Sequence, residues 1–306
     1  MVKLSAHRAF GPVLGVVRFV RTLRVAIASG LAASAAASAE PPRWVVSDAD
    51  STMVLFPTIH ILPKKIRWQT DGLVADLEAA NDVWFELEPS EMQNQALMQR
   101  LSAEYGLSPE RPLSERLDRE TYQRFAETAR GLGLDPARLD PFRPWLAAIT
   151  LSVTDLVRDG FTPGAGVEAV LSAMVPEDKH RGLETAEEQL GFFAALPPEV
   201  EVAFLRQTLE EIGESAGELR ALARSWAAGD ISELETMMIE SIRDVSEELY
   251  VKLLVERNRA WADRLERELE GEGQDFVAVG GGHLVGEQGL PQLLAERGYN
   301  VTGPGF

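Results

Sequence analysis

The chain has 306 residues, no cysteine and a formal net charge of −18 at pH 7. The absence of cysteine excludes disulfide bonds and thiolate metal sites, so packing alone must stabilise the fold. The acidic charge, with no basic stripe to offset it, excludes nucleic acid and anionic membrane surfaces as partners.

The first 39 residues have the composition of a secretory signal peptide. They carry five Lys or Arg residues and no acid, then a small apolar stretch over 25–36 and the triplet Ala37-Ser38-Ala39. This order predicts cleavage after Ala39, export and a periplasmic location. Arginines at helical spacing keep a mitochondrial presequence open as the alternative. The apolar run is too short to span a bilayer and no second run follows, so we expect no stable membrane insertion.

The mature chain, residues 40–306, begins with alternating elements. Apolar runs over 43–46 and 53–56 flank a polar turn, which predicts a β-hairpin. Thr70 is placed to cap a helix over 71–80, and the run 83–87 predicts another strand. The order strand, helix, strand favours a right-handed crossover.

Residues 90–271 are mainly helical in pattern. Leucines and alanines recur there at spacings of three and four residues, and prolines mark the boundaries. One short strand is predicted at 180–184. The longest helix is predicted from Ser232 or Ser241 to Glu268.

The last part of the chain, 272–306, alternates again. A strand over 276–279 precedes three glycines and His283, and a helix over 290–297 leads to a strand over 299–302. We therefore expect an α/β fold whose sheet is built from strands of both chain ends, in βαβ units, with a large helical middle region. Residues 40–89 and 272–306 would form the sheet core of a single domain, 40–306, with 90–271 as a mainly helical insertion.

Two histidines directly follow short apolar strands. His60 comes just after Thr58 at the end of the hairpin's second strand, and His283 follows the glycine turn. Ligand sites in open α/β sheets form at the carboxyl ends of strands, so this matched placement favours a shared site. A hydrogen-bonded structural histidine is the alternative for each taken alone. His180 precedes its strand, so we interpret it as structural.

Glu86 lies near the end of its strand among apolar neighbours. Two imidazoles and one carboxylate suffice to hold a divalent metal with open positions. Such a metal lowers the pKa of a bound water and polarises a carbonyl. Spacing alone nevertheless favours a solvated acid at this position. Three glycines, Gly280, Gly281 and Gly282, do not match a nucleotide-binding motif and instead predict close approach of the backbone to a site. Thr58, two residues before His60, is predicted to approach the same site or its substrate.

Several motifs together resemble the TraB/GumN family. The stretches 48–63 and 80–87 are similar to the family's opening, and 276–286 is similar to its ending. Between them, the segment from Gly182 to Thr185, then Trp226 and the pair Arg257-Asn258 follow in the family's order. The likeness therefore covers nearly the whole mature chain. The family resembles the erythromycin esterase and ChaN-like group, and its animal TIKI members are similar to metal-dependent proteases that use manganese or cobalt.

The resemblance implies an exported metal-dependent hydrolase, and among hydrolases a peptidase, with a peptide or small-molecule substrate. It implies a metal, manganese or cobalt with zinc as a further candidate, bound by His60, His283 and Glu86. The other implied site residues are Glu86 as a general base, and Arg257, Asn258 and Glu184 lining or bracing the site.

One departure from the family pattern concerns the second of its two G-x-x-H motifs. Gly280 to His283 forms one complete motif, whereas Pro57 stands where the other motif has glycine. Proline fixes φ and has no N–H, so a backbone donor is lost there. This supports an alternative, a non-catalytic binding or inhibitory protein of the cell envelope that uses the same cleft. A third hypothesis is an interaction protein whose acidic helical middle contacts a partner.

Overall fold

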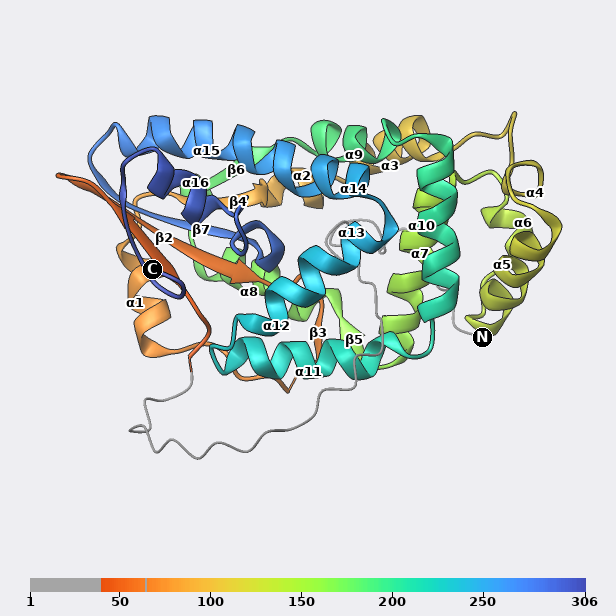
Figure 1. Ribbon diagram of the computed structural model, residues 1–306, viewed down its shortest axis with the longest axis horizontal. Coiled ribbons are helices and arrows are strands. Elements are labelled where there is room, and N and C mark those ends of the chain that lie inside the picture. Colours follow the sequence, from red (N-terminus) through yellow and green to blue (C-terminus); the bar gives the residue numbers. More distant parts are fainter. Residues whose placement is uncertain (1–39, 64) are drawn as a thin grey trace.

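The computed structural model describes residues 40–63 and 65–306, so the predicted signal peptide lies outside the described residues. Within this part of the chain, no helix is both long enough and apolar enough to cross a membrane. Figure 1 shows an elongated molecule with a sheet toward one end and the helices α4 to α6 at the other.

A six-stranded mixed sheet forms the core, in the order β6-β4-β7-β2-β1-β8. Four neighbouring strands, β6, β4, β7 and β2, run parallel, and β1 pairs antiparallel with β2 and β8. The strands are β1 Trp44–Ser47, β2 Ser51–Thr58, β4 Val83–Leu87, β6 His180–Glu184, β7 Gly273–Gly280 and β8 Asn300–Thr302. A second small sheet pairs β3 Leu62–Pro63 with β5 Phe161–Thr162.

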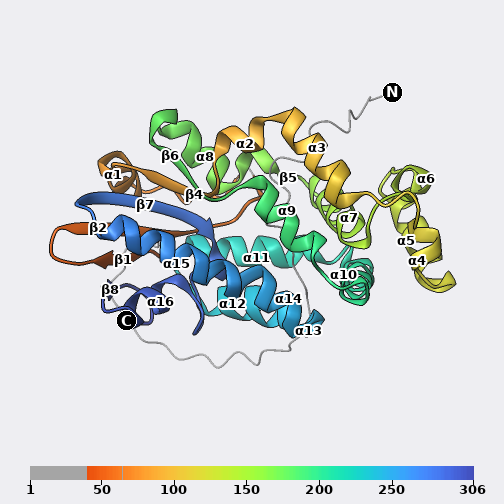
Figure 2. The ribbon, with the colours of Figure 1, turned by 90° about the horizontal axis from the view of Figure 1, so that it is seen from above.

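Helices cover the sheet and extend beyond it, with α1 packed on β7 and α15 packed on β2 and β6 (Figure 2). The helices are α1 Asp71–Ala79, α2 Pro89–Gln93, α3 Gln95–Gly106, α4 Leu113–Arg116, α5 Arg119–Gly131, α6 Pro136–Leu139, α7 Pro144–Arg158, α8 Val167–Met174, α9 Ala186–Ala194, α10 Pro198–Glu211, α11 Ser215–Ala227, α12 Ser232–Glu235, α13 Ser241–Val245, α14 Glu247–Tyr250, α15 Glu256–Leu269 and α16 Leu290–Glu296.

The α/β prediction is confirmed, with strands from both chain ends in one sheet. The hairpin forms between β1 and β2, and the Thr70 side chain caps α1 by accepting a hydrogen bond from Leu73 N. Three features were not predicted, and the first is the small sheet of β3 and β5. The C-terminal strand β7 lies between β2 and β4, so the two strands joined through α1 are not neighbours, and β6 from the helical middle forms one edge of the sheet.

The predicted long helix up to Glu268 is wrong at one point, because the chain breaks at Ser246. This residue is extended, with φ −171°, and its side chain accepts a hydrogen bond from Glu248 N. A serine that caps a new helix competes with continuation of the previous one. The result is one helical stretch ending at Val245 and another beginning at Glu247.

Pro57 fits within β2 without the loss of a hydrogen bond. It lies opposite Val279 of β7, but β1 pairs with β2 only as far as Leu55. The Pro57 carbonyl accepts a hydrogen bond from Trp226 Nε1 at 2.9 Å, so it points away from β7. The N–H and C=O of a strand residue point to the same side. The missing N–H therefore faces the side on which β2 has no partner strand, where proline is tolerated.

This arrangement predicts that Trp226→Phe destabilises the fold by leaving the buried Pro57 carbonyl unpaired. Trp145→Phe is a matched control, because Trp145 is equally buried and its Nε1 has no hydrogen-bond partner. We expect Trp226→Phe to lower the free energy of unfolding by about 1–3 kcal/mol more than the control. Urea denaturation measures both values. Equal losses would contradict this role of Trp226.

Candidate functional site

Four charged or imidazole side chains meet at one edge of the sheet. Glu86 lies in β4, Glu184 ends β6, His60 follows β2 and His283 follows β7. These four strands are parallel, so their carboxyl ends point to the same edge. This is the edge at which open α/β sheets bind ligands.

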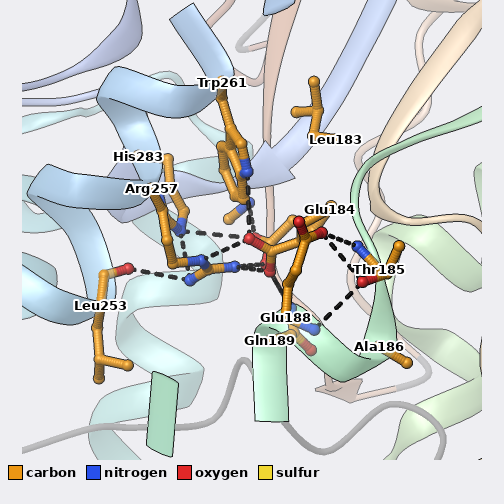
Figure 3. A network of polar contacts seen from close by, with 12 residues as sticks. Leu183, Glu184, Thr185, Ala186, Glu188, Gln189, Leu253, Arg257, Trp261 and His283 are labelled. Atoms are coloured by element: carbon orange, nitrogen blue, oxygen red, sulfur yellow. Dashed lines mark hydrogen bonds and ion pairs between the residues drawn. The ribbon is translucent and has the colours of Figure 1, made fainter. Parts of the chain in front are cut away.

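Arg257 of α15 lies at the centre of this cluster. Figure 3 shows it together with Glu184 and His283. Its Nε donates to Glu184 Oε2 at 3.0 Å, and its Nη2 donates to Glu184 Oε1 and to Glu86 Oε2, both at 2.7 Å. Its Nη1 donates to the Leu253 carbonyl at 3.0 Å. One buried guanidinium thus bonds to the ends of two strands and compensates two buried carboxylates.

Two further side chains hold the buried carboxylates in place. Trp261 Nε1 donates to Glu184 Oε2 at 3.2 Å, and its ring stacks against Arg257, 4.6 Å from the guanidinium carbon. Gln189 Nε2 donates to Glu184 Oε1 at 2.8 Å and to Glu86 Oε2 at 3.4 Å. The second Glu86 oxygen accepts the Gly280 N–H at 2.8 Å. Glu86 is therefore a buried, fully bonded residue, and the expectation of a solvated acid from spacing alone is not met.

His283 is buried, with 5% of its side chain exposed. Its Nδ1 lies 2.5 Å from Asn258 Oδ1, and the Asn258 amide donates to the Gln288 carbonyl at 2.6 Å. With the amide oriented in this way, Nδ1 carries the hydrogen and Nε2 is the acceptor. Arg257 Nη1 donates to this Nε2 at 3.1 Å. Asn258 thus braces His283 and sets its tautomer.

His60 is the more accessible histidine, with 18% of its side chain exposed. Its Nδ1 lies 2.7 Å from Glu168 Oε1, and its Nε2 lies 3.6 Å from Glu86 Oε1. Thr58 donates its hydroxyl to the same oxygen of Glu168. His60 is thus oriented by a carboxylate and directs its Nε2 toward Glu86.

The charge states of the two histidines differ because their neighbours differ. Burial by itself lowers the pKa of His60, but the facing carboxylates of Glu168 and then Glu86 outweigh it and raise that pKa to about 9. Burial and then the Arg257 cation lower the pKa of His283 to about 3. Burial opposes ionisation of Glu86, yet Arg257 and the two imidazoles hold its pKa well below the usual range. At neutral pH, His60 is therefore cationic, His283 neutral and Glu86 anionic.

Only the first glycine of the triplet borders this cluster. A Cβ at Gly280 would lie 2.9 Å from Glu86 Oε1 and 3.2 Å from His60 Nε2. A Cβ at Gly281 would meet Leu234, and one at Gly282 would meet Met238. The close backbone approach that was expected at all three glycines therefore occurs at Gly280. The missing side chains of the other two glycines instead leave room for Leu234 and Met238 from neighbouring helical segments.

Glu168 was not identified from the sequence. It reaches His60 because Gly166 lets α8 begin against the His60 backbone, where a Cβ would lie 2.1 Å from the His60 carbonyl oxygen. Val167 N also donates to the Ile59 carbonyl at 3.0 Å. The available signal was a glycine directly before a helix that carries an acid in its first turn. His180, interpreted as structural, packs edge-on against Phe85 and stays outside the cluster.

Some of the side-chain atoms that could bind a divalent metal lie close together in this cluster. The Nε2 atoms of His60 and His283 lie 3.6 and 3.8 Å from the same Glu86 oxygen, and Gly280 leaves the adjoining space free of a side chain. The three atoms do not all lie within 4.8 Å of one another. In this structure His283 Nε2 accepts a hydrogen bond from Arg257 Nη1, so the lone pair that a shared ion would need is occupied.

A second group of potential donors lies at the opposite ends of the strands. Within the described residues, the set whose ligand atoms do all lie within 4.8 Å of one another is Asp82, Glu268 and Asp275. Asp82 directly precedes β4 and Asp275 lies early in β7. This acidic group is therefore separate from the histidine cluster.

Comparisons with known proteins match most of the chain. The model of the TraB/PrgY/gumN family matches residues 42–303. A protein of Escherichia coli (strain K12) with the name "Uncharacterized protein YbaP" is 28% identical over 185 residues, which are 60% of this chain and 67% of YbaP. YbaP of Shigella flexneri matches to the same extent. No solved structure matches.

The central position of Arg257 predicts a large loss of stability in Arg257→Met. The substitution leaves Glu86 and Glu184 buried without their cation, which costs about 3–5 kcal/mol. Arg259→Met on the same helix is the control, because Arg259 is exposed and donates only to the Gln288 side chain. Chemical denaturation at pH 7 compares the two variants. A loss no greater than in the control would contradict the central role of Arg257.

The two histidines should titrate at opposite ends of the pH range. We expect His60 to keep its proton until pH rises to about 9, and His283 to stay neutral until pH falls to about 3. The His60 contribution to stability is then complete below about pH 6.5 and is lost as pH rises through 9. The His283 contribution is complete above about pH 6.5 and is lost as pH falls toward 3. Imidazole NMR titration measures both pKa values, and midpoints of both near 6.5 would refute the assignment.

Proposed function

The chain belongs to the TraB/PrgY/gumN family, and on that premise we propose that it is an exported metal-dependent hydrolase that cleaves a peptide or a small ester or amide. One observation carries the proposal: two imidazole Nε2 atoms lie within 4 Å of one oxygen of the buried Glu86 carboxylate. A cavity lined by His60 and Glu86 adjoins this point. An ionised acid, two histidines and a cavity are the parts that hydrolysis at a carbonyl needs.

His60, Glu86 and His283 are the residues that would hold the divalent metal, with manganese or cobalt proposed and zinc as a further candidate. When bound there, such a metal polarises a carbonyl and lowers the pKa of its water. Glu86 stays ionised beside Arg257 and can accept a proton or a hydrogen bond from an attacking water. The Arg257 contacts to Glu86 and Glu184 keep the reacting groups in place when a substrate enters.

His60 carries the proton that a leaving group needs. Glu168 orients the imidazole through Nδ1, and the opposite nitrogen, Nε2, faces the cavity side of Glu86. With its pKa raised to about 9, His60 is protonated while no metal is bound and can then donate from Nε2 as a general acid. A metal held by Nε2 would take the place of that proton, so the general-acid role belongs to the reaction without a metal. Its greater exposure than His283 supports this division of roles.

A second candidate is the same hydrolysis without a metal. It is favoured by the bond from Arg257 Nη1 to His283 Nε2, which occupies the lone pair that a metal would use. In this case, Glu86 accepts a proton from the attacking water and the protonated His60 donates one to the leaving group.

The decisive experiment assays the purified protein on a panel of peptides and p-nitrophenyl esters, with manganese, cobalt, zinc or a chelator. We expect cleavage that the chelator abolishes, and a loss of about 10²-fold or more in His60→Gln, Glu86→Gln and His283→Gln. His180→Gln is the control, because His180 is also buried but lies outside the cluster.

Metal content, measured in the wild-type protein and in His283→Gln, separates the two candidates. Metal in the wild type alone supports the metal-dependent reaction. Cleavage that persists in chelator, with no metal in either protein, supports the metal-free reaction. Binding of substrates without cleavage under every condition would overturn both and favour the binding-protein alternative.

A further inference from the structure

A cavity of about 250 Å³ opens beside His60. It lies between the carboxyl end of β4, helix α2 and helix α8, and the short turn Pro163–Ala165 closes one side. His60 and Glu86 line it, so its contents lie next to the proposed reacting groups. Ligand cavities in proteins are usually about 300–1,000 Å³, so this one suits a single bulky group rather than a whole large ligand.

The cavity has a polar end and apolar walls. Glu86 is buried and the His60 and Glu168 side chains are largely so, whereas Gln93 and Ala169 are exposed at the rim. The walls between them are mainly apolar, with Leu87, Pro89, Met92 and Pro163. Burial of apolar surface against these walls would stabilise an apolar group of the ligand.

The charges around the cavity exclude anionic groups. Among the described residues, its lining includes the two carboxylates Glu86 and Glu168 and no Lys or Arg. The His60 imidazole is paired with Glu168, and the nearby Arg257 guanidinium is bonded to Glu86 and Glu184. Away from the residues that would hold a metal, a ligand carboxylate or phosphate would lose its hydration in this cavity without gaining a free cation from the described side chains. Neutral or cationic groups meet no such cost.

We propose that this cavity is the specificity pocket of the site and accepts one apolar, uncharged or cationic group of the substrate, such as an apolar amino-acid side chain or a short acyl chain. The neighbouring scissile carbonyl would then lie beside His60. This inference rests on the proposed function for the reaction, but the binding preference follows from the cavity alone. It selects against acidic peptides and phosphorylated or carboxylated small molecules.

The test measures binding separately from cleavage. N-acetyl-phenylalanine amide and the anion N-acetyl-glutamate amide are titrated into ¹⁵N-labelled protein, and shifts of the amide signals of α8 report binding. We expect the uncharged aromatic probe to bind at least about tenfold more tightly than the anion, which corresponds to about 1.4 kcal/mol. Equal binding of the two probes would overturn the proposal.

A pair of matched variants locates the binding. Ala169→Phe places a large side chain on the wall of the cavity, and Ala173→Phe makes the same change at an exposed position of α8 that does not line it. We expect Ala169→Phe to weaken binding of the aromatic probe at least about tenfold and the control to leave it unchanged. No difference between the two variants would overturn the pocket assignment.

A substitution that adds a positive charge tests the predicted exclusion of anionic groups from the cavity. Ser172→Lys introduces a cation into the lining of the cavity, and we expect it to raise affinity for the anionic probe. Probe binding that follows these rules without any cleavage would overturn the proposed hydrolase and support the pocket. Cleavage that is the same in Ala169→Phe and the wild type would overturn the pocket and leave the hydrolase proposal intact.

Discussion

One buried guanidinium, that of Arg257, holds together the strand ends at the edge of the sheet where the histidine cluster lies. Arg257 donates to Glu86 in β4 and to Glu184 at the end of β6, and it contacts His283 beyond β7. Each carboxylate alone would be costly to bury, and the cation between them makes their burial possible. The sheet edge, the α15 helix and the charge states of the cluster therefore depend on the same residue.

The surroundings of the two histidines in the cluster give them different charge states and different accessibility. His283 is locked between Asn258 and Arg257, neutral and almost inaccessible, so it resembles a fixed acceptor. His60 is partly exposed, protonated by virtue of Glu168, and borders the cavity. Two titratable groups of one kind with pKa values pushed apart are a common basis for dividing acid and base roles. In the proposed function, the apolar walls and acidic end of the cavity beside His60 would add selectivity to this arrangement.

Pro57 illustrates how a departure from a motif can be neutral for the structure. From the sequence, a proline in place of glycine suggested the loss of a backbone donor near His60. In the fold, Pro57 lies beyond Leu55, the last residue of β2 that pairs with β1, and its carbonyl accepts a hydrogen bond from Trp226 Nε1. Pro57 therefore costs the sheet no hydrogen bond, and its position does not by itself favour the non-catalytic alternative.

The sequence by itself determined the six strands of the main sheet, their order between polar turns and the placement of His60, Glu86 and His283 near strand ends, but not the two strands of the small sheet. These follow from local patterns, because the periodicity of a strand and the residues that end it lie within a few positions of one another in the sequence. The break at Ser246 was missed because a serine is compatible with both a helix interior and a cap.

Only the tertiary structure decided which side chains meet. Arg257 and Glu86 are 171 positions apart, and Thr58 and Glu168 are 110 apart. The insertion of β7 between β2 and β4, and the approach of α8 allowed by Gly166, have no local signature in the chain. Such contacts depend on which elements become neighbours when the whole core packs, and that is a property of the fold as a unit.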